Sequence, residues 1–491
     1  MTSPESIPLN TGSHGSRNKK NFPPQILEAV EITGAGGEGK SIAKVDGMVI
    51  FVTGAVPGDV ADLQITRKKR RHAEAIVLRL IKASPHRVEP FCQHFGVCGG
   101  CKWQHLSYPQ QLYYKRQQVI DNLERLGGLE LPAVLPILPS PETTFYRNKL
   151  EFTGSSGRWF TTDELATMGE ISDRNALGFH IPGRFDKVLD IVQCHLQPDP
   201  SNAIRLWVRQ HAAENELSFY NVREHIGFIR NLTIRTTTTG ELMVLLALGH
   251  EDEEARIRLL EGLIAEFPQT TSLLWTINPK KNDTIWDLEI NGFHGRDHII
   301  QEIPDGLEGA PLKFRIGPKT FFQTNPEQAV NMFRLIRDLA EIDENDLVYD
   351  LYCGAGSISL FLAPHARLVI GAEIVPEAID DAKLNAALNN ITNIHFEAGD
   401  LKDLLDQDFI ARNGTPDVLI TDPPRSGMHE DVVMRILEMA PKRIVYVSCN
   451  PATQARDLAL MKEAYSITVV QPVDMFPHTY HVENLVRLDR R

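Results

Sequence analysis

The chain has 491 residues, of which 42% are hydrophobic and 23% are charged, and this is typical of a soluble protein with roughly two to four domains. No apolar run approaches the length of about 18 residues that a membrane-spanning helix needs, so the sequence excludes such a helix. The formal net charge of −13 argues mildly against a nucleic-acid-binding protein whose whole surface is basic. A local basic patch can still bind an anionic partner.

The N-terminal residues 1–21 are polar and rich in Ser, Asn and Gly. They lack the apolar stretch of a signal peptide, so we predict a disordered tail. Six cysteines in the whole chain are too few for a disulfide scaffold and indicate a reducing compartment. We therefore expect a cytoplasmic protein.

Residues 22–84 are predicted to form a small all-β domain. Short apolar stretches such as Met48–Val52 and Val60–Ile65 alternate with turns that contain Gly and Pro, and this pattern suits an OB-like barrel. The densest basic run of the chain, Arg67–Arg71, follows the second of these strands. Lys and Arg often protect an exposed edge strand. Because consecutive cations repel one another, we favour an anionic partner, and RNA phosphate is the first candidate.

Four cysteines of the next segment have the chemistry of metal ligands. Cys92, Cys98 and Cys101 have Cys-x5-Cys-x2-Cys spacing, and Cys194 lies far down the chain. Four thiols suit either tetrahedral zinc or an iron–sulfur cluster. Zinc sites usually contain two Cys-x2-Cys pairs, and this chain has one, so we favour a structural [4Fe–4S] cluster. The spacing differs from that of radical enzymes that cleave S-adenosylmethionine.

Residues 85–318 are predicted to form a central α+β domain. The segment Tyr108–Leu126 has helical periodicity and ends at a Gly pair, and residues 145–300 show short strands mixed with loops.

From residue 319 to residue 491 the pattern changes to alternating helices and strands. Asp346–Tyr352 is a predicted strand, Cys353–Ser357 a tight Gly-x-Gly loop, and Ile358–Ala363 a helix. This order is typical of a cofactor-binding opening in a Rossmann-like domain. The third glycine of the dinucleotide fingerprint is missing, so the loop does not require a pyrophosphate.

Polar residues recur where successive predicted strands end. They are Glu373, Asp400, Asp422 and Cys449. The carboxyl ends of parallel strands meet at one edge of a sheet, where open α/β folds bind their ligands. The set suits S-adenosylmethionine, which has a ribose and an adenine but no phosphate.

Cys449 ends a strand, Arg443–Ser448, that is rich in β-branched residues and therefore expected to be buried on both faces. A lone cysteine in such a place is more often structural than reactive. A predicted hairpin of Ile467–Val470 and Leu485–Leu488 follows. Between its strands lie three candidate bases, each of which alone would more often be an ordinary surface residue: His478, His481 and Glu483.

Several of these motifs together resemble the RNA uracil-5-methyltransferase family, in particular its 23S rRNA branch, which carries a TRAM domain and an iron–sulfur cluster. The residues that carry the resemblance are Phe321–Asn325, Asp350–Gly354, Asp422–Arg425, Ser448–Pro451 and His481–Glu483, together with the cysteine set. The resemblance covers nearly the whole chain after the tail.

The resemblance implies roles for particular residues. Cys92, Cys98, Cys101 and Cys194 would hold a [4Fe–4S] cluster, Cys449 would be the nucleophile and Glu483 the base. The positions that would contact S-adenosylmethionine are Gln323, Tyr352, Ser357, Glu373, Asp400 and Asp422. Ser357 and Asp400 stand where the family pattern has Asn, and both side chains can still form hydrogen bonds.

The implied reaction explains the residue types. The C5 atom of uracil is a weak nucleophile until a thiolate adds to C6 and moves electron density to C5. A base must then remove the C5 proton before the thiolate can leave. The uracil must leave its stack to reach such a pocket, and Phe321 or Phe322 could stack on it.

Two other functions are alternatives to uracil methylation. An amino-group methyltransferase also uses an acidic-Pro-Pro motif, but it has an aromatic residue where this chain has Arg425 and needs no thiol. A non-catalytic iron–sulfur RNA-binding protein would have no use for Cys449 with Glu483. Ribosomal RNA is favoured over transfer RNA as the substrate, because the transfer RNA relatives usually lack the extra N-terminal domain. Nothing in the sequence requires more than a monomer.

Overall fold

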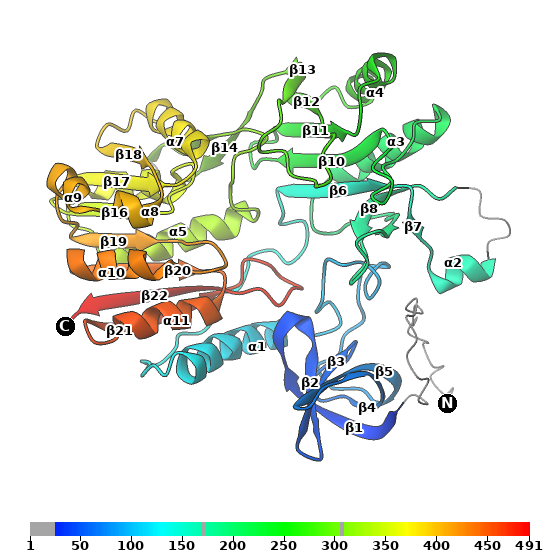
Figure 1. Ribbon diagram of the computed structural model, residues 1–491, viewed down its shortest axis with the longest axis horizontal. Helices are drawn as coiled ribbons and strands as arrows, with labels where there is room; N and C mark the ends of the chain where they lie inside the picture. Colours follow the sequence, from blue (N-terminus) through cyan, green and yellow to red (C-terminus); the bar gives the residue numbers. More distant parts are fainter. Residues whose placement is uncertain (1–24, 168–172, 305–308) are drawn as a thin grey trace.

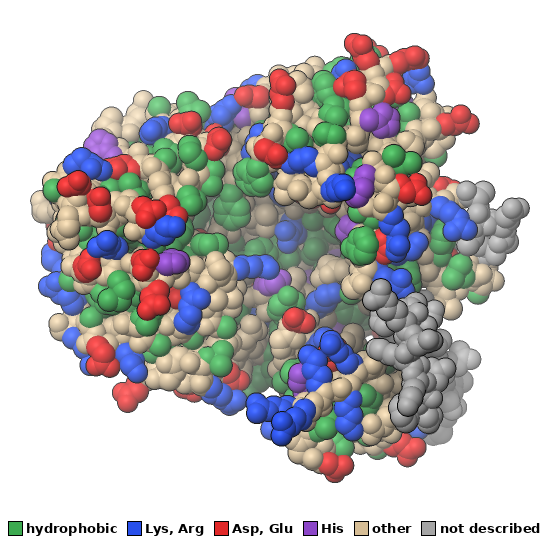
Figure 2. Space-filling view, viewed as in Figure 1, with side chains coloured by type: hydrophobic (Ala, Val, Ile, Leu, Met, Phe, Trp, Pro, Cys, Tyr) green, Lys and Arg blue, Asp and Glu red, His purple; other side chains and the backbone are tan. Residues whose placement is uncertain are grey.

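The computed structural model describes residues 25–167, 173–304 and 309–491. The chain is arranged as a small N-terminal barrel, a large mixed sheet and a C-terminal sheet layered between helices (Figure 1). Figure 2 shows that the surface is hollowed where these three parts meet. The disordered tail predicted for residues 1–21 lies outside the described residues.

The N-terminal strands close into a barrel in the order β1-β2-β3-β5-β4, and β4 pairs back to β1. Ile50 and Val52 of β3 point into the barrel and are buried, because alternate side chains of a strand share one face. The predicted OB-like barrel is confirmed. Its elements are β1 (Ile26–Ala35), the turn η1 (Gly37–Gly39), β2 (Ser41–Val45), β3 (Met48–Thr53), β4 (Val60–Lys68) and β5 (His72–Lys82).

The barrel contacts the rest of the chain at Gly39. The indole Nε1 of Trp103 donates a hydrogen bond to the Gly39 carbonyl oxygen at 3.3 Å. Gly39 has a φ of +75°, and a Cβ at this position would lie 2.7 Å from Cβ of Lys102 and 3.3 Å from the ring of Tyr480. Only glycine allows this close approach.

The central sheet has the order β13-β12-β11-β10-β6-β8-β9-β7. Strand β11 is buried on both faces: Val244 and Leu246 pack beneath helices α3 and α4, whereas Met243 and Leu245 join the core of the C-terminal part. The central sheet and the C-terminal domain therefore share a continuous apolar core. The elements are β6 (Lys149–Ser155), β7 (Arg158–Trp159), α2 (Thr162–Thr167), β8 (Ala176–His180), β9 (Val188–Leu189), α3 (Ser201–Glu214), β10 (Ile229–Thr236), β11 (Leu242–Leu248), α4 (Glu253–Glu266), β12 (Ser272–Ile277) and β13 (Asn291–Gly295).

The C-terminal sheet has the order β18-β17-β16-β19-β20-β22-β21, in which the first five strands are parallel and the last two run antiparallel to their neighbours. Its alternate residues bury on opposite faces, as Val348 and Tyr349 of β16 do in separate apolar clusters. Helices cover both faces, so the parallel strands are continuously apolar, as the sequence predicted. The strands are β16 (Leu347–Leu351), β17 (Leu368–Glu373), β18 (Ile394–Ala398), β19 (Val418–Thr421), β20 (Arg443–Ser448), β21 (Tyr465–Val473) and β22 (Glu483–Arg490).

The Rossmann-like fold predicted for the C-terminal part is confirmed. Its helices are α5 (Pro326–Ala340), α6 (Ser357–Leu362), α7 (Pro376–Leu388), α8 (Leu401–Leu404), α9 (Gln407–Asn413), α10 (Glu430–Met439) and α11 (Pro451–Met461), with a short turn η4 (Ala363–His365) after α6. A two-stranded sheet of β14 (Ile299–Ile303) and β15 (Leu312–Ile316) packs into the same core as α5.

Helix α1 (Tyr108–Asp121) and the π-helical turn η2 (Asn122–Leu126) pack against the C-terminal sheet, although they lie within the segment that the sequence assigned to the central domain. Val119 and Leu123 are fully buried in the same cluster as Tyr446 of β20. The inward face of α1 also carries two buried polar residues, Gln111 and Lys115.

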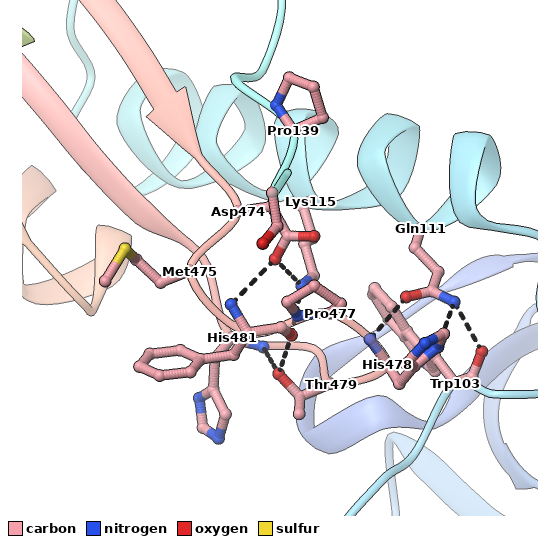
Figure 3. A network of polar contacts seen from close by, with 12 residues as sticks. Trp103, Gln111, Lys115, Pro139, Asp474, Met475, Pro477, His478, Thr479 and His481 are labelled. Carbon is pink, nitrogen blue, oxygen red and sulfur yellow. Dashed lines mark hydrogen bonds and ion pairs between the residues drawn. The ribbon is translucent and has the colours of Figure 1, made fainter. Parts of the chain in front are cut away.

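Lys115 forms a buried ion pair with Asp474, in the segment that joins β21 to β22. The distance from Lys115 Nζ to Asp474 Oδ1 is 2.6 Å, and both side chains are fully buried. Nζ also donates to the Phe476 carbonyl oxygen at 2.9 Å (Figure 3). Burial lowers the pKa of Lys115, and the charge of Asp474 opposes that effect.

Replacing Lys115 with Met should reduce the free energy of unfolding by about 3–5 kcal/mol, because Asp474 would remain buried without its partner. Urea unfolding measures the change. The double variant Lys115→Met/Asp474→Leu should recover much of the loss, since it removes both charges. Lys44→Met, at an exposed position, is the matched control. Equal stabilities of Lys115→Met and Lys44→Met would show that the pair contributes nothing.

Candidate active site and cysteine cavity

The predicted site residues of the C-terminal domain gather at one edge of the sheet. The parallel strands β16, β17, β18, β19 and β20 all end there, and β22 begins there because it runs antiparallel to β20. The side chains at or next to these strand ends are Tyr352, Glu373, Asp400, Asp422, Cys449 and Glu483. The fold therefore places residues that lie more than a hundred positions apart along one crevice.

The loop after β16 is shaped to approach a ligand closely. Tyr352 has a φ of +63°, and Gly354 and Gly356 have φ values of +53° and +81°. A Cβ on Gly356 would lie 2.7 Å from Leu360, so a larger residue does not fit. The Glu373 carboxylate accepts hydrogen bonds from the backbone N–H groups of Gly354, at 3.2 Å, and Val375, at 3.0 Å. These bonds hold the carboxylate beside the glycine loop.

Three other predicted cofactor contacts, Ser357, Asp400 and Gln323, lie on separate segments. Ser357 is the first residue of α6, directly after Gly356. Asp400 caps α8 by accepting from the Lys402 backbone N–H, and it forms an ion pair with the Lys402 side chain at 3.1 Å. The side-chain hydrogen bond with Lys402 lowers the pKa of Asp400. The Gln323 carbonyl oxygen accepts from Asn148 Nδ2 at 3.1 Å, which ties its loop to the start of β6.

Cys449 and Glu483 lie next to each other across two paired strands. Ser448 of β20 is the register partner of Asn484 of β22, so the residue after the first and the residue before the second are neighbours. Cys449 is partly exposed. The pKa of its thiol is raised to about 11, chiefly by burial and also by the charges of Glu483 and Asp422, while the charge and hydrogen bond of Arg425 oppose the shift. Arg425 is therefore the group that favours the thiolate.

Two carboxyl groups near Cys449 hold their protons unusually strongly. Burial, with a smaller contribution from the Asp422 charge, raises the pKa of Glu483 to about 8, and Arg425 opposes the shift. Burial also raises the pKa of Asp422 to about 7, helped by the charge of Asp350. Such shifts are typical of proton-transfer groups in enzyme sites, although structural carboxyls can show them too.

The histidines of the same loop differ from Glu483. Burial lowers the pKa values of His478 and His481 to about 4, and nearby cations add to the effect. Both are therefore neutral at pH 7. Of the two phenylalanines expected to stack on a base, Phe321 is 68% exposed, whereas Phe322 is buried in the core against Phe314. Only Phe321 is free to contact a ligand.

The four cysteines with metal-ligand spacing line one cavity of about 650 Å³. Gly99 lies in its wall, where a Cβ would come within 2.5 Å of the His180 carbonyl oxygen. The Gly100 backbone N–H points at Cys98 Sγ at 3.4 Å. Burial raises the pKa of Cys101 to about 11 and of Cys194 to about 12, and the four thiols are all free. Among the described residues, no three His, Cys, Asp or Glu side chains lie close enough to hold a single metal ion.

Comparison with known proteins identifies the family. The profile described as tRNA (Uracil-5-)-methyltransferase matches residues 294–491, and the TRAM domain profile matches residues 28–78. An uncharacterized RNA methyltransferase of Bacteroides thetaiotaomicron is 56% identical over 92% of this chain and 99% of its own length. The chain belongs to the RNA uracil-5-methyltransferase family. It is an S-adenosylmethionine-dependent RNA methyltransferase with an N-terminal TRAM domain, as the sequence motifs indicated.

Other relatives agree with this assignment. An uncharacterized RNA methyltransferase of Porphyromonas gingivalis is 51% identical over 94% of this chain and 99% of its own length. The crystal structure of Pyrococcus abyssi tRNA (uracil-54, C5)-methyltransferase in complex with S-adenosyl-L-homocysteine has a TM-score of 0.71 and 27% identity, and the match covers 94% of this chain and 100% of that one. In the part of the methyltransferase that the structure describes, no helix is long and apolar enough to cross a membrane.

Two residues near the site were not singled out from the sequence. Gln111 and Lys115 are buried polar residues of α1, whose apolar positions alone account for its helical periodicity. They lie four residues apart, in register with the buried Val119, so they share its inward face. Polar residues on the buried face of a helix are the signal that could have identified them.

Glu483→Gln should change the pH dependence of stability. The ordinary pKa of this carboxyl is 4.5 and the folded value is about 8, so the native state keeps a proton that the unfolded state releases in this window. The corresponding stability is present below about pH 4.5 and is lost as the pH rises to about 8, with a slope of about 1.4 kcal/mol per pH unit.

Urea unfolding at several pH values between about 5 and 8 measures this slope. The unfolding free energy of the wild type should fall relative to that of Glu483→Gln as the pH rises. Glu463→Gln, at an exposed position, should run parallel to the wild type. Parallel curves for Glu483→Gln as well would contradict the raised pKa.

Proposed function

We propose that this methyltransferase transfers the methyl group of S-adenosylmethionine to C5 of a uridine in RNA through a covalent bond between Cys449 and C6 of the ring. The observation that carries the proposal is the pairing of Cys449 with Glu483 across β20 and β22, at the same edge as the glycine loop. A nucleophile and a base beside a cofactor loop are the groups that this reaction needs.

The residues at the sheet edge fit the cofactor. The glycines of the loop leave room for close backbone approach, and Glu373 is held by two N–H groups where a carboxylate can bind ribose hydroxyls. Gln323, Tyr352, Ser357, Asp400 and Asp422 would complete the contacts. S-adenosylmethionine supplies an electrophilic methyl group when bound.

Residues of this chain would carry the remaining steps. The Cys449 thiolate, favoured by Arg425, adds to C6 of uracil, and the electron pair of the C5–C6 double bond becomes available at C5. C5 then forms a bond to the methyl carbon as the bond between that carbon and the sulfonium sulfur breaks, and S-adenosylhomocysteine leaves. The ionised Glu483 takes the C5 proton, the C5–C6 double bond re-forms, and the C6–sulfur bond breaks to restore the thiolate.

The burial of Glu483 suits its proposed role. A carboxylate with a pKa of about 8 is a stronger base than an exposed one, so it can accept a proton from a carbon acid more readily. Glu483 is itself buried, and this keeps bulk water away from the base. The exposed Phe321 is placed on the loop that carries Gln323, where it can stack on a flipped uracil.

The barrel would hold RNA beside this pocket. Arg67–Arg71 covers the end of β4 and the turn into β5, and all of these side chains are exposed. Exposed cations bind phosphates by releasing counterions. We favour 23S rRNA as the substrate on the resemblance of the motifs and domain order. Transfer RNA is the second candidate, because the Pyrococcus abyssi enzyme of similar fold is a tRNA (uracil-54, C5)-methyltransferase.

Mass mapping of RNA from a deletion strain distinguishes the two substrates. Loss of 5-methyluridine from 23S rRNA would support the first candidate, and loss from transfer RNA alone would support the second. We also infer that the enzyme works as a monomer in the cytoplasm.

Cys92, Cys98, Cys101 and Cys194 would hold a [4Fe–4S] cluster. The support is that all four thiols line one cavity, with a backbone N–H directed at the sulfur of Cys98. Soft thiolate ligands and N–H···S bonds are typical of such clusters. The cluster would link the segment after the barrel to β9 and α3, and so stabilise the central sheet.

The cluster assignment predicts the metal content. Protein purified without oxygen should be brown and contain about four iron and about four sulfide per chain. Cys194→Ser should lose most of the iron, whereas Cys353→Ser, a buried thiol outside the cavity, should retain it. Colourless wild-type protein that contains zinc would contradict the assignment.

The covalent mechanism predicts opposite behaviour of two variants. Glu483→Gln should accumulate a protein–RNA adduct, because the methylated ring cannot lose its C5 proton, and the adduct appears as a shifted band on denaturing gels. Cys449→Ala should form no adduct and lose methyl transfer by at least about a thousandfold, while RNA affinity changes little. Turnover by Cys449→Ala would remove the nucleophile, and absence of adduct in Glu483→Gln would remove the base.

A further inference from the structure

The segment Asp474–Val482, between β21 and β22, leads directly into Glu483. We call it the base loop. Its backbone is held from several distant parts of the chain: Gln328 Nε2 donates to the Asp474 carbonyl oxygen at 3.0 Å, and Asn325 Nδ2 donates to that of Met475 at 3.1 Å. The Tyr146 hydroxyl donates to the Pro477 carbonyl oxygen at 3.1 Å. The place of Glu483 therefore depends on contacts outside its own sheet.

Gln111 of α1 makes two side-chain contacts to this loop, both to His478. It is fully buried. Its Oε1 accepts from the His478 backbone N–H at 2.8 Å, and its Nε2 lies 3.2 Å from His478 Nδ1. The same Nε2 donates to the carbonyl oxygens of Trp103, at 3.0 Å, and Leu106, at 2.8 Å (Figure 3). One amide thus joins the base loop to the segment that follows Cys101.

The backbone of that segment makes a second connection to the same residue. The N–H groups of Lys102 and Trp103 both donate to the His478 carbonyl oxygen, at 2.8 and 3.0 Å. His478 has a φ of +65°, a conformation that is less favourable for a residue with a side chain, so contacts with its surroundings help to hold it there. Gln111 and the two N–H groups are those surroundings.

We propose that Gln111 is a positioning residue for proton removal in the methyl-transfer reaction. It fixes His478 against the segment after Cys101 and so sets where the Glu483 carboxyl lies. The inference rests on the proposed role of Glu483 as the base.

The two reacting groups depend on the base loop to different degrees. Cys449 follows β20, a strand paired on both sides by β19 and β22, and the next residues begin helix α11. Glu483 is the first residue of β22, so the base loop immediately precedes it. Loosening the loop displaces Glu483 before Cys449. Adduct formation therefore continues, whereas resolution of the adduct slows.

The test is Gln111→Leu in the full-length protein, with Gln117→Leu as a matched control on the same helix. Gln117 is half-buried, and its Nε2 donates to Asp121 Oδ1, one turn away on α1. Gln111→Leu should lower kcat about tenfold or more, as expected for the loss of one or two buried hydrogen bonds, and leave KM for RNA within about twofold. The fraction of enzyme in covalent adduct at steady state should rise about fivefold or more.

Hydrogen exchange gives a readout that does not depend on activity. The amides of the base loop should exchange faster in Gln111→Leu than in the wild type, while those of β20 stay unchanged. Gln111→Asn, which keeps the amide but shortens the side chain by one carbon, should change the adduct fraction in the same direction. Gln111→Asn replaces Gln111→Leu in the test if the Leu variant does not accumulate as folded protein.

A fall in kcat without a rise in adduct fraction would overturn the inference, because it indicates a general loss of folded enzyme. Unchanged kcat and unchanged exchange would overturn it as well. The proposed function fails separately: if Glu483→Gln traps no adduct, Glu483 is not the base. If Glu483→Gln traps adduct and Gln111→Leu does not, only the role of Gln111 is lost.

Discussion

The buried ion pair between Lys115 and Asp474 is the constraint on which the arrangement of the site depends. Both charges are removed from water, so each needs the other, and the pair is maintained only while α1 and the base loop stay in contact. This contact attaches a helix that follows the cysteine segment to the last hairpin of the chain. Segments separated by more than three hundred residues are thereby brought into one rigid unit.

The carboxyl groups at the sheet edge form a second, electrostatic constraint. Burial raises the pKa of Asp350, Asp422 and Glu483. The charge of Asp350 adds to the shift of Asp422, and that of Asp422 adds to the shift of Glu483. Negative charge near Cys449 also disfavours its thiolate, and Arg425 is the cation that compensates. Because these groups titrate together, the number of protons that they share determines whether Cys449 and Glu483 are ionised at the same time.

Much of the fold could be predicted because its signals are local. The β-branched run Arg443–Ser448 is buried on both faces, as its pattern indicated, and the strand–glycine loop–helix order around Gly354 marks the Rossmann-like domain. Open α/β sheets bind ligands at the carboxyl ends of their parallel strands, and this generalisation predicts that Glu373, Asp422 and Cys449 lie at one edge of the sheet. These inferences need only strand order and direction.

The tertiary contacts of α1 could not be predicted in the same way. Periodicity identified the helix but not its partner, so the packing of Val119 against the C-terminal sheet appears only in the structure. The same limit applies to Phe321 and Phe322, which are adjacent and identical in type but opposite in exposure. Distant partners and side-chain direction depend on packing, which a single sequence does not encode locally.

The contact at Gly39 has a consequence for how far along a nucleic acid the protein can reach. The turn after β1 abuts Lys102 and Tyr480, so the barrel is seated against the same loop that precedes Glu483. A barrel joined by a long, free linker would sample many spans between its anchoring point and the reactive pocket. Here the contact at Gly39 holds the barrel at one distance from the reactive residues. On the proposed function, the enzyme would select a uridine by its distance along the RNA from the phosphates bound to the barrel.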